Sequence, residues 1–230
     1  MIGIITATEE EFAALKQIMP QARSVKGHAG MEFLVGTLGT VEVVGVQAGI
    51  GKVNAAVCTQ VMIDRFEPEK IINVGVAGAL NPELHVGDIV ISTDAAQHDF
   101  DTTFFGDEPG YITGLPGVYM AADEALKNLA SRAAERLGLR YRIGRVVTGD
   151  QFVAAPEKKA YLVTQFQGDC TEMEGGAIAQ TCQLNQVPFV IIRAISDGAD
   201  DGAPMQYEEF VHLAAARAME LIQTMLKEIE

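Results

Sequence analysis

The sequence predicts an α/β protein in which a mixed, mainly parallel sheet carries helices on both faces. Short apolar, β-branched runs alternate with helical stretches along the whole 230-residue chain, and this alternation is typical of sheets built from strand–helix–strand units. Several of the runs are almost continuously apolar, as expected for strands that are covered on both faces. The hydrophobic content of 48% is enough to bury a substantial core.

The expected strands share this apolar, β-branched character. They are Ile2–Thr6, Val41–Val46, Lys70–Val76, Asp88–Ser92, Arg145–Thr148 and Val187–Ile195. Apolar residues that recur every three to four positions predict the helices. These are Glu9–Met19, Val53–Phe66, Asp123–Leu137, Gly176–Leu184 and Tyr207–Lys227. Glu32–Leu38 precedes Val41–Val46 across Gly39 and Thr40, which predicts an antiparallel hairpin and therefore a mixed sheet.

The chain shows no shift in composition and no linker rich in Pro or Ser, so we expect residues 1–230 to form a single domain. One stretch stands apart. Asp94–Gly117 lacks periodicity, is rich in glycine and contains Phe104, Phe105 and Tyr111. A loop of roughly 20 residues in a compact domain usually has a function, either as a lid or as a contact for a partner.

The formal net charge of −14 excludes several classes of partner. Such a field repels phosphodiesters and phospholipid head groups, so we expect neither nucleic-acid nor membrane binding. No apolar run approaches the roughly 18–20 residues of a membrane span. Met1–Ile5 leads directly into a strand without a basic segment or cleavage site, which predicts a cytoplasmic location.

Cysteine and histidine positions argue against a metal centre. The three cysteines are widely spaced, which favours buried thiols over a disulfide framework or a metal site. His98 with Asp99 and Asp101 has the composition of a metal corner, but one histidine and two carboxylates on a loop are more often solvated. We therefore expect no metal and no cofactor.

The most informative segment is the apolar strand that delivers Arg193, Ser196 and Asp197 to its carboxyl end, where ligands bind in open α/β sheets. Charges buried there are costly unless they pair or react. Partial desolvation would raise the pKa of Asp197, as a general acid requires. An Arg193–Asp197 ion pair with a helix cap explains the segment equally well.

Carboxylates also follow the first predicted strand and precede the predicted helix that begins at Gly176. Thr8 and Glu11 have the spacing of a capping box, which favours a capping role over catalysis when this turn is considered alone. In extended geometry Glu172 and Glu174 point to one side and Met173 to the other. The two glutamates suit a helix N-terminus, and they are equally suited to accept hydrogen bonds from sugar hydroxyls.

Two glycine-containing turns are ambiguous. Gly49–Lys52 resembles a phosphate loop only superficially, because Val46 and Val53 stand where that loop needs Gly and Ser or Thr. Its glycines allow close backbone approach to a ligand or to a strand. Phe152, after Gly149, either holds a planar base or packs in the core.

Taken together, these segments resemble one family. The matching motifs, in order, are Thr6–Glu11, Gly49–Lys52, Asn73–Gly78, Val86–Val90, Gly149–Phe152, Glu172–Glu174 and Arg193–Asp197. They match the pattern of the 5′-methylthioadenosine/S-adenosylhomocysteine nucleosidases from Ile2 to the last helix. The resemblance implies the purine nucleoside phosphorylase-like fold, a three-layer α/β/α domain that usually forms homodimers.

The resemblance implies a hydrolase that cleaves the N-glycosidic bond of methylthioadenosine, adenosylhomocysteine and 5′-deoxyadenosine, in the service of methionine salvage. Cleavage requires a better leaving group, a stabilised ribosyl cation and a nucleophile on the opposite face. By analogy, Asp197 protonates adenine N7 and Ser196 orients its carboxyl group. Glu11, assisted by Arg193, would position and deprotonate water.

The resemblance also assigns the substrate contacts. Phe152 would stack on adenine while backbone groups of Val153 read its edge, and Glu174 would bind the ribose hydroxyls with Met173 against the sugar. The side chains expected around the 5′-alkylthio group are Ile50, Val76, Phe105 and Tyr207. The loop around Phe105 would reach the site of a second copy.

Three alternatives remain open. A phosphorylase of the same fold must hold phosphate, and the acidic turn Glu9–Glu11 disfavours that anion. A hydrolase for a related adenine-type nucleoside, of the futalosine kind, would differ mainly in its 5′-pocket. A non-catalytic nucleoside-binding protein would be favoured by loss of the acid or of Glu11, and both are present.

Overall fold

The strands form one mixed sheet that partly closes on itself. A computed structural model describes residues 1–200 and 202–228, and within these residues ten strands pair in the order β10-β6-β8-β9-β5-β1-β4-β3-β2, with β7 paired to β6. An additional β10–β5 pairing closes β5, β9, β8, β6 and β10 into a ring. The longest pairings, β10 with β5 and β6 with β8, are parallel. The predicted α/β class with a mixed sheet is therefore confirmed.

The strands have the following bounds: β1 (Ile2–Thr6), β2 (Arg23–Lys26), β3 (Glu32–Leu38), β4 (Val41–Gln47), β5 (Lys70–Ala79), β6 (Ile89–Gln97), β7 (Met120–Ala121), β8 (Tyr141–Thr148), β9 (Cys170–Glu172) and β10 (Phe189–Asp197). The helices are α1 (Glu9–Ile18), α2 (Lys52–Phe66), α3 (Glu124–Arg136), α4 (Pro156–Phe166), α5 (Gly175–Leu184) and α6 (Ala203–Leu226), with a short 3₁₀ helix, η1, at Thr103–Phe105.

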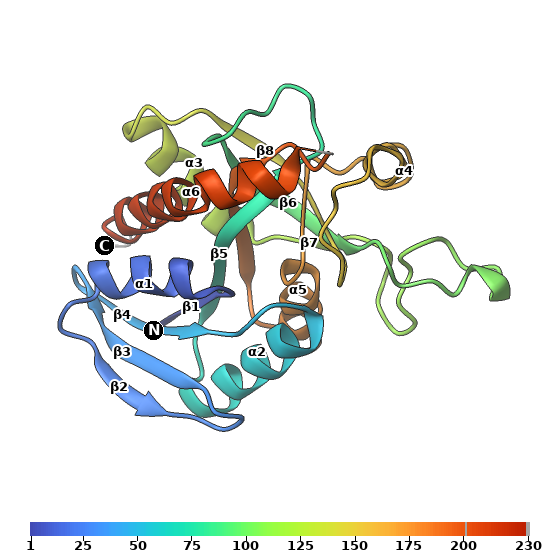
Figure 1. The fold of residues 1–230 in the computed structure, drawn as a ribbon. Helices are drawn as coiled ribbons and strands as arrows, with labels where there is room; N and C mark the ends of the chain where they lie inside the picture. The colour runs from blue at the N-terminus through green and yellow to red at the C-terminus, as the bar shows by residue number, and fades with distance from the viewer. Residues whose placement is uncertain (201, 229–230) are drawn as a thin grey trace.

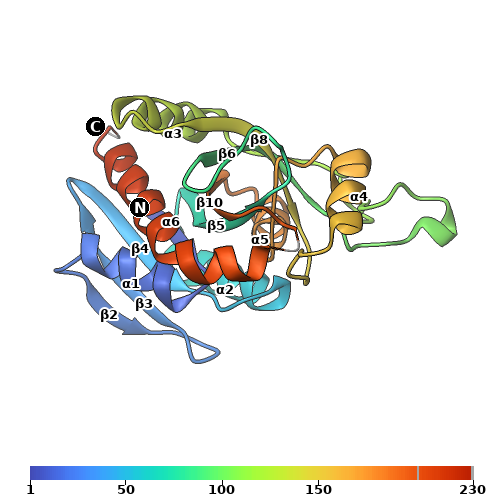
Figure 2. The same cartoon turned by 45° about the horizontal axis from the view of Figure 1, so that its top comes forward.

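Helices cover both faces of the sheet. Helices α1, α3 and α6 pack on one face, and α2 and α5 pack on the other (Figures 1 and 2). Neighbouring residues of a strand point to opposite faces, so Ile4 of β1 lies in the first core and Ile5 in the second. In β10, Ile192 and Ile191 alternate in the same way. This double burial explains why these strands are almost continuously apolar in the sequence.

The topology gathers the ends of several strands. Strands β1, β4, β5 and β10 run parallel to their neighbours in this part of the sheet, so their carboxyl ends lie at one edge. Strand β9 runs antiparallel to β5 and places Thr171 beside Gly78, close to the end of β5. Residues after Thr6, around Gly78, at Glu172 and at Asp197 therefore converge, although the sequence separates them widely.

Some elements differ from the prediction. Strand β6 continues to Gln97, where the sequence predicts a loop from Asp94 onward. Asp94 pairs with Arg145 of β8 through contacts of 2.6 and 3.0 Å, and this partner is not visible in the local pattern. Helix α4 is also absent from the prediction, because only Leu162 and Phe166 of its residues are buried. The remainder of the predicted loop projects from the body and carries η1 at its tip (Figure 1).

The state of the cysteines and the character of the helices can be compared with the sequence. Cys58, Cys170 and Cys182 are free and buried, as predicted. Among the helices in the described part of the chain, none combines the length and the apolar character that a membrane span requires. The cytoplasmic location stays a prediction.

Candidate active site

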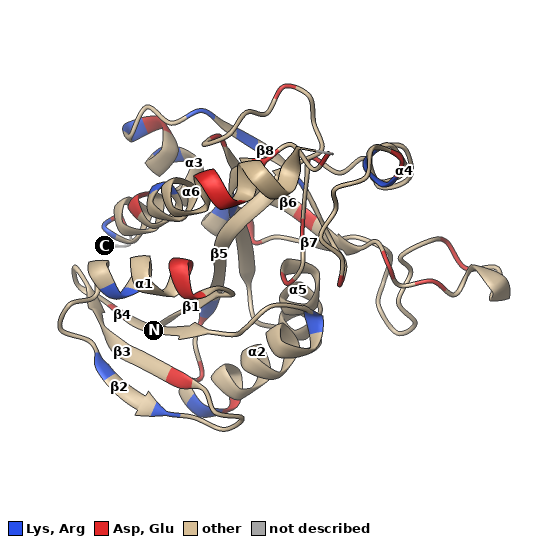
Figure 3. Cartoon of the chain, viewed as in Figure 1, with Lys and Arg blue, Asp and Glu red and all other residues tan. Residues whose placement is uncertain are grey.

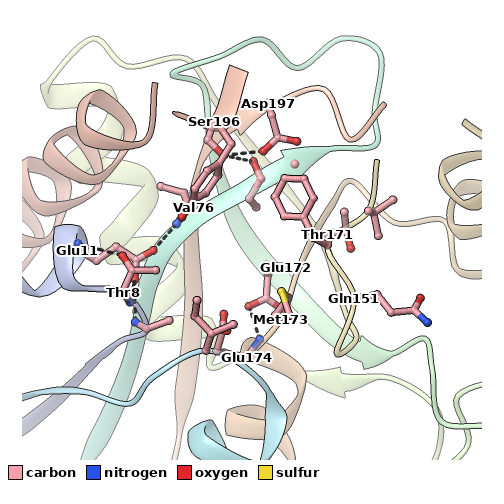
Figure 4. A pocket seen from close by; sticks show the side chains of 17 residues that line it. Thr8, Glu11, Val76, Gln151, Thr171, Glu172, Met173, Glu174, Ser196 and Asp197 are labelled. Carbon is pink, nitrogen blue, oxygen red and sulfur yellow. Dashed lines mark hydrogen bonds between the residues drawn. The ribbon is translucent and has the colours of Figure 1, made fainter. Parts of the chain in front are cut away.

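A cavity of about 360 Å³ opens where the strand ends converge (Figure 4). Most of the residues proposed from the sequence line it: Glu11, Ile50, Val76, Phe152, Val153, Met173, Glu174, Ser196, Asp197 and Tyr207. Two do not. Arg193 is buried behind the wall, and Phe105 is 80% exposed on the projecting segment. The convergence of distant strand ends, and not any local motif, creates this site.

Asp197 occupies one wall at the end of β10 and is almost fully buried. Its Oδ2 accepts a hydrogen bond from the Ser196 hydroxyl at 2.8 Å, and its Oδ1 accepts one from the Ala199 N–H at 2.9 Å. Burial raises the pKa of Asp197, and these two hydrogen bonds offset only part of that rise. The carboxyl group is thus held in place and biased towards its protonated form.

Glu11 faces the cavity from the first turn of α1, which is acidic (Figure 3). Its Oε2 accepts hydrogen bonds from the N–H groups of Ala7 (2.8 Å) and Thr8 (3.1 Å), and Thr8 Oγ1 accepts from the Glu11 N–H at 3.3 Å. The expected capping box is therefore present. Its Oε1 also accepts from the Val76 N–H of β5 at 3.0 Å. Capping and exposure to the cavity coexist in this side chain.

A glycine makes this approach possible. A Cβ atom added at Gly75 would lie 2.5 Å from Glu11 Oε1 and 3.0 Å from Arg193 Nη1. Any larger residue would displace one of these groups, since such separations are shorter than van der Waals contact. Gly75, within the Asn73–Gly78 motif, thus allows the Glu11 carboxylate and the Arg193 guanidinium to approach the same backbone position.

Within the described residues, Arg193 forms a hydrogen bond with neither Asp197 nor Glu11, the two partners expected from the sequence. Its Nη2 donates to Asn73 Oδ1 at 2.5 Å and to Glu172 Oε2, so the suggested Arg193–Asp197 ion pair is wrong. No hydrogen bond joins Arg193 to Glu11 among the described contacts, although both flank Gly75. Burial alone would lower the pKa of Arg193, but the charges of Glu172, Glu11 and Glu174 raise it. The guanidinium lies behind the cavity wall and offsets the negative charge of these three carboxylates.

Glu172 is the residue that sequence reasoning underestimated. It accepts hydrogen bonds from the Thr148 hydroxyl, from the Glu174 N–H (3.1 Å) and from the Gly175 N–H (2.7 Å), in addition to the Arg193 contact. The only signal in the sequence was its alternation with Glu174. Two of these partners, Arg193 and Thr148, lie 21 and 24 residues away along the chain, and the local pattern does not reveal them.

Glu174 stands across the cavity from Asp197 (Figure 4). It precedes α5, and its Oε1 accepts a hydrogen bond from the Gly51 N–H at 2.8 Å. Burial and the neighbouring charge of Glu172 raise the pKa of Glu174 to about 8. This carboxyl group therefore gains and loses its proton near pH 8.

Aromatic and apolar side chains form the rest of the wall. Phe152 and Tyr207 meet edge to face with ring centroids 5.8 Å apart. Burial, followed by the charges of Glu11 and Glu10, raises the pKa of Tyr207 to about 12, so the phenol stays neutral. Ile50 is 57% exposed and Val153 is buried. The cavity can take a flat, largely apolar ligand with polar groups at its two ends.

The suggested metal corner has other roles. His98 is buried rather than solvated, because it packs under Gly149 and against Phe166. Asp99 binds Lys52 and Asp101 accepts from Thr103. Within residues 1–200 and 202–228, no group of three or more His, Cys, Asp or Glu side chains has an arrangement that could hold a metal ion.

Comparison with known proteins identifies the family. A model of the phosphorylase superfamily matches residues 1–229. The 5′-methylthioadenosine/S-adenosylhomocysteine nucleosidase of Geobacillus thermodenitrificans is 45% identical over 230 residues, which cover 99% of this chain and 97% of that protein.

Solved structures extend the likeness. The enzyme of that name from Neisseria meningitidis, in complex with methylthio-immucillin-A, has a TM-score of 0.95 at 39% identity, with 99% of each chain covered. A futalosine hydrolase of Helicobacter pylori also has a TM-score of 0.95, at 30% identity, with 99% of this chain and 97% of that chain covered. The fold alone therefore does not separate these two activities.

The relatives named nucleosidases are N-glycosidic hydrolases, and the prediction of an enzyme of this class is confirmed. The chain belongs to the phosphorylase superfamily and, within it, to the family of 5′-methylthioadenosine/S-adenosylhomocysteine nucleosidases.

Proposed function

We propose that this protein hydrolyses the N-glycosidic bond of 5′-methylthioadenosine and S-adenosylhomocysteine, and also of 5′-deoxyadenosine, releasing adenine and the 5′-substituted ribose. One observation carries the proposal: a single cavity holds a buried acid, Asp197, on one wall and the carboxyl groups of Glu11 and Glu174 on the others. Hydrolysis of this bond needs an acid for the leaving group and a base for water, on opposite sides of the sugar.

Asp197 acts on the leaving group. Its proton passes to adenine N7 while the C1′–N9 bond breaks, so the bonding electron pair leaves with a neutral base. The raised pKa of Asp197 supports this role, because the acid must be protonated before the reaction. The Ser196 hydroxyl, 2.8 Å away, fixes the orientation of the carboxyl group.

Glu11 acts on water. It accepts one proton from a water molecule whose oxygen forms the new bond to C1′. Three backbone N–H groups, from Ala7, Thr8 and Val76, fix the carboxylate at the edge of the cavity. Arg193 acts indirectly, through the charge that it supplies behind Glu172 and Glu11.

The remaining residues bind substrate. Phe152 stacks on adenine, and backbone groups of Val153 accept and donate at its edge. Glu174 binds the ribose hydroxyls and Met173 packs against the sugar. Ile50, Val76 and Tyr207 supply apolar surface for the 5′-alkylthio group, and all three line the cavity. The reaction would serve methionine salvage.

Phosphate is a poor nucleophile for this cavity. Among the described residues that line it, none is Lys or Arg, and four are acidic: Glu11, Glu172, Glu174 and Asp197. An incoming phosphate dianion would meet like charge without a cationic partner, which is strongly unfavourable. The acidic lining therefore favours a hydrolase over a phosphorylase of the same fold.

We also propose a homodimer in which the projecting segment contacts the second copy. Phe104 and Phe105 are 93% and 80% exposed at its tip, and such a pair of aromatic side chains is typical of a protein interface. Sedimentation at micromolar concentration should give twice the chain mass of 24.6 kDa. A monomer under these conditions contradicts this part of the proposal.

A substrate panel tests the proposed function. Adenine release is measured with methylthioadenosine, adenosylhomocysteine, 5′-deoxyadenosine and a futalosine-type nucleoside. We expect turnover of the first three, because their 5′-groups face apolar side chains. Turnover of the futalosine-type nucleoside alone would select the rival hydrolase. Tight binding without turnover of any of them would indicate a nucleoside-binding protein.

A further inference from the structure

Three side chains beside the cavity form a closed set of contacts. Lys52 Nζ lies 2.6 Å from Asp99 Oδ1, Asp99 Oδ2 accepts the Asp150 N–H at 2.8 Å, and Asp150 Oδ1 accepts the Lys52 N–H at 2.8 Å. The set joins the start of α2 to the segments that follow β6 and β8. None of the three residues lines the cavity. We call this set the Lys52 clamp.

The Lys52 clamp is directly connected to two parts of the site. Next to Lys52, the Gly51 N–H donates to Glu174 Oε1 at 2.8 Å. On the other side, Asp150 stands two residues before Phe152, in the turn proposed to hold adenine. Any shift of Lys52 relative to Asp150 would therefore move the ribose-binding carboxylate relative to the aromatic side chain.

The start of α2 depends on these distant acceptors. Gly51 precedes the helix and has no side chain to cap it, and the first N–H groups of a helix need acceptors from elsewhere. Here the acceptors are Glu174 and Asp150, 123 and 98 residues away in the sequence. Gly49 and Gly51 both have positive φ, so the turn has little conformational preference of its own to hold it in place.

The ion pair is the strongest part of the Lys52 clamp. The side chains of Lys52 and Asp99 are only 19% and 17% exposed, so solvent screens them less than it screens surface pairs. Burial alone would raise the pKa of Asp99, but hydrogen bonds from Lys52 and from the Asp150 N–H lower it. The Asp99 carboxylate is thus held ionised, and it contacts Lys52 and the Asp150 N–H at the same time. Asp150 itself is exposed.

We propose that the Lys52 clamp is a positioning device that sets the distance between Glu174 and Phe152, and thereby the affinity for adenine nucleosides, without taking part in the chemical step. Lys52 and Asp99 are positioning residues in this scheme. The inference rests on the proposed function for the identity of the ligand, and on the contacts above for the coupling.

The test compares two matched carboxylates of the same region. Asp99→Asn removes the charge that Lys52 needs. Asp94→Asn is the control, because Asp94 also pairs at 2.6 Å, with Arg145, and the side chains of that pair are 19% and 18% exposed. We expect Asp99→Asn to raise KM for methylthioadenosine roughly tenfold, with kcat changed less than about threefold. Asp94→Asn should lower Tm about as much as Asp99→Asn does, and it should leave KM unchanged.

A second readout does not depend on turnover. Binding of methylthio-immucillin-A, an adenine-nucleoside analogue with both a base and a sugar-like ring, is measured by calorimetry for both variants, and its Kd should rise roughly in step with KM for Asp99→Asn only. If Asp99→Asn destabilises the fold, the double variant Lys52→Met/Asp99→Asn leaves no unpaired charge and should show the same rise in KM. The two substitutions should be non-additive, as expected for partners in one contact.

Two results would overturn the inference. One is an unchanged KM and an unchanged Kd for methylthio-immucillin-A in folded Asp99→Asn protein. The other is an equal change in Asp94→Asn, which would indicate a general loss of stability. Failure of the proposed function is seen separately, since the unaltered protein would then release no adenine, while binding of this nucleoside analogue would still report on the Lys52 clamp.

Discussion

At the scale of single residues, the surroundings of Asp197 decide its chemistry. The side chain is 3% exposed, and its hydrogen bonds come from a hydroxyl and a backbone N–H rather than from a cation. Such an environment favours the neutral form of a carboxyl group, because desolvation penalises the charged form. The sequence offered an ion pair and an acid as equal interpretations, and the engagement of Arg193 with Glu172 removes the ion pair.

Replacement of this acid should therefore affect rate more than binding. We expect Asp197→Asn to lower kcat for methylthioadenosine by at least about 10²-fold, because the amide has no acidic proton for N7. The KM should change much less, since the side-chain volume and the contact with Ser196 persist. Steady-state adenine release gives both constants. A kcat close to that of the unaltered protein would exclude Asp197 as the general acid.

Glu174 should make stability depend on pH. Its pKa is raised from 4.5 to about 8, mainly by burial. The folded protein therefore binds this proton more tightly than the unfolded chain does, and the resulting contribution to the free energy of unfolding is full below pH 4.5 and is lost as pH rises towards 8. Glu174→Gln retains an acceptor for Gly51 and cannot ionise. The Tm of this variant relative to the unaltered protein should therefore increase by roughly 5 °C between pH 5 and pH 8.

Thermal unfolding of the ligand-free protein at both pH values measures this difference. Glu220→Gln, on the exposed side of α6, is the control and should give a nearly constant difference in Tm. A constant difference for Glu174→Gln as well would mean that burial does not raise the pKa of this carboxyl group in the folded protein.

At the scale of elements, the hydrogen bond from the Val76 N–H of β5 to the first turn of α1 sets the position of Glu11. A methyl group at Gly75 would lie 2.5 Å from Glu11 Oε1, so Gly75→Ala should displace the carboxylate. We expect kcat to fall on the order of 10²-fold, because a shift of about 1 Å in a reacting group is that costly. At Gly117 an added methyl group meets nothing within 4 Å, so Gly117→Ala serves as control. Equal kcat values for the two variants would contradict the proposed role of Glu11.

The predicted elements were most accurate where burial on both faces makes a strand continuously apolar. Strand β1 matches its predicted bounds, and β10 differs by two residues at each end. Such strands end at the cavity, so the position of Asp197 alone singles it out, whereas Glu174 is singled out by its place before a predicted helix and receives its role from the family resemblance. Helix α4 escaped prediction because it buries only two side chains and gives no apolar stripe.

Contacts between distant segments could not be predicted from the sequence. The pairing of Arg193 with Glu172 and of Lys52 with Asp99 depends on how the sheet closes through the β10–β5 pairing. His98 and Asp99 were interpreted as a solvated loop, because a local pattern cannot reveal Gly149 above the ring or Lys52 beside the carboxylate. Charge partners are a property of the tertiary fold.

At the scale of the whole molecule, two cores cover the two faces of one sheet, and the site lies at its edge. The organisation of residues 1–230 as a single domain stays a prediction. The net charge of −14 and the acidic lining of the cavity act in the same direction, since both lower the local concentration of anions. Water carries no net charge, so this field does not lower its local concentration.

In the proposed reaction, water activated by Glu11 attacks C1′ while Asp197 protonates the base. This reaction is tested by measuring adenine release from methylthioadenosine in phosphate-free buffer and in buffer with millimolar phosphate. The sugar product is identified by mass spectrometry. We expect equal rates and 5-methylthioribose in both buffers. A rate that requires phosphate, together with 5-methylthioribose 1-phosphate as product, would contradict it.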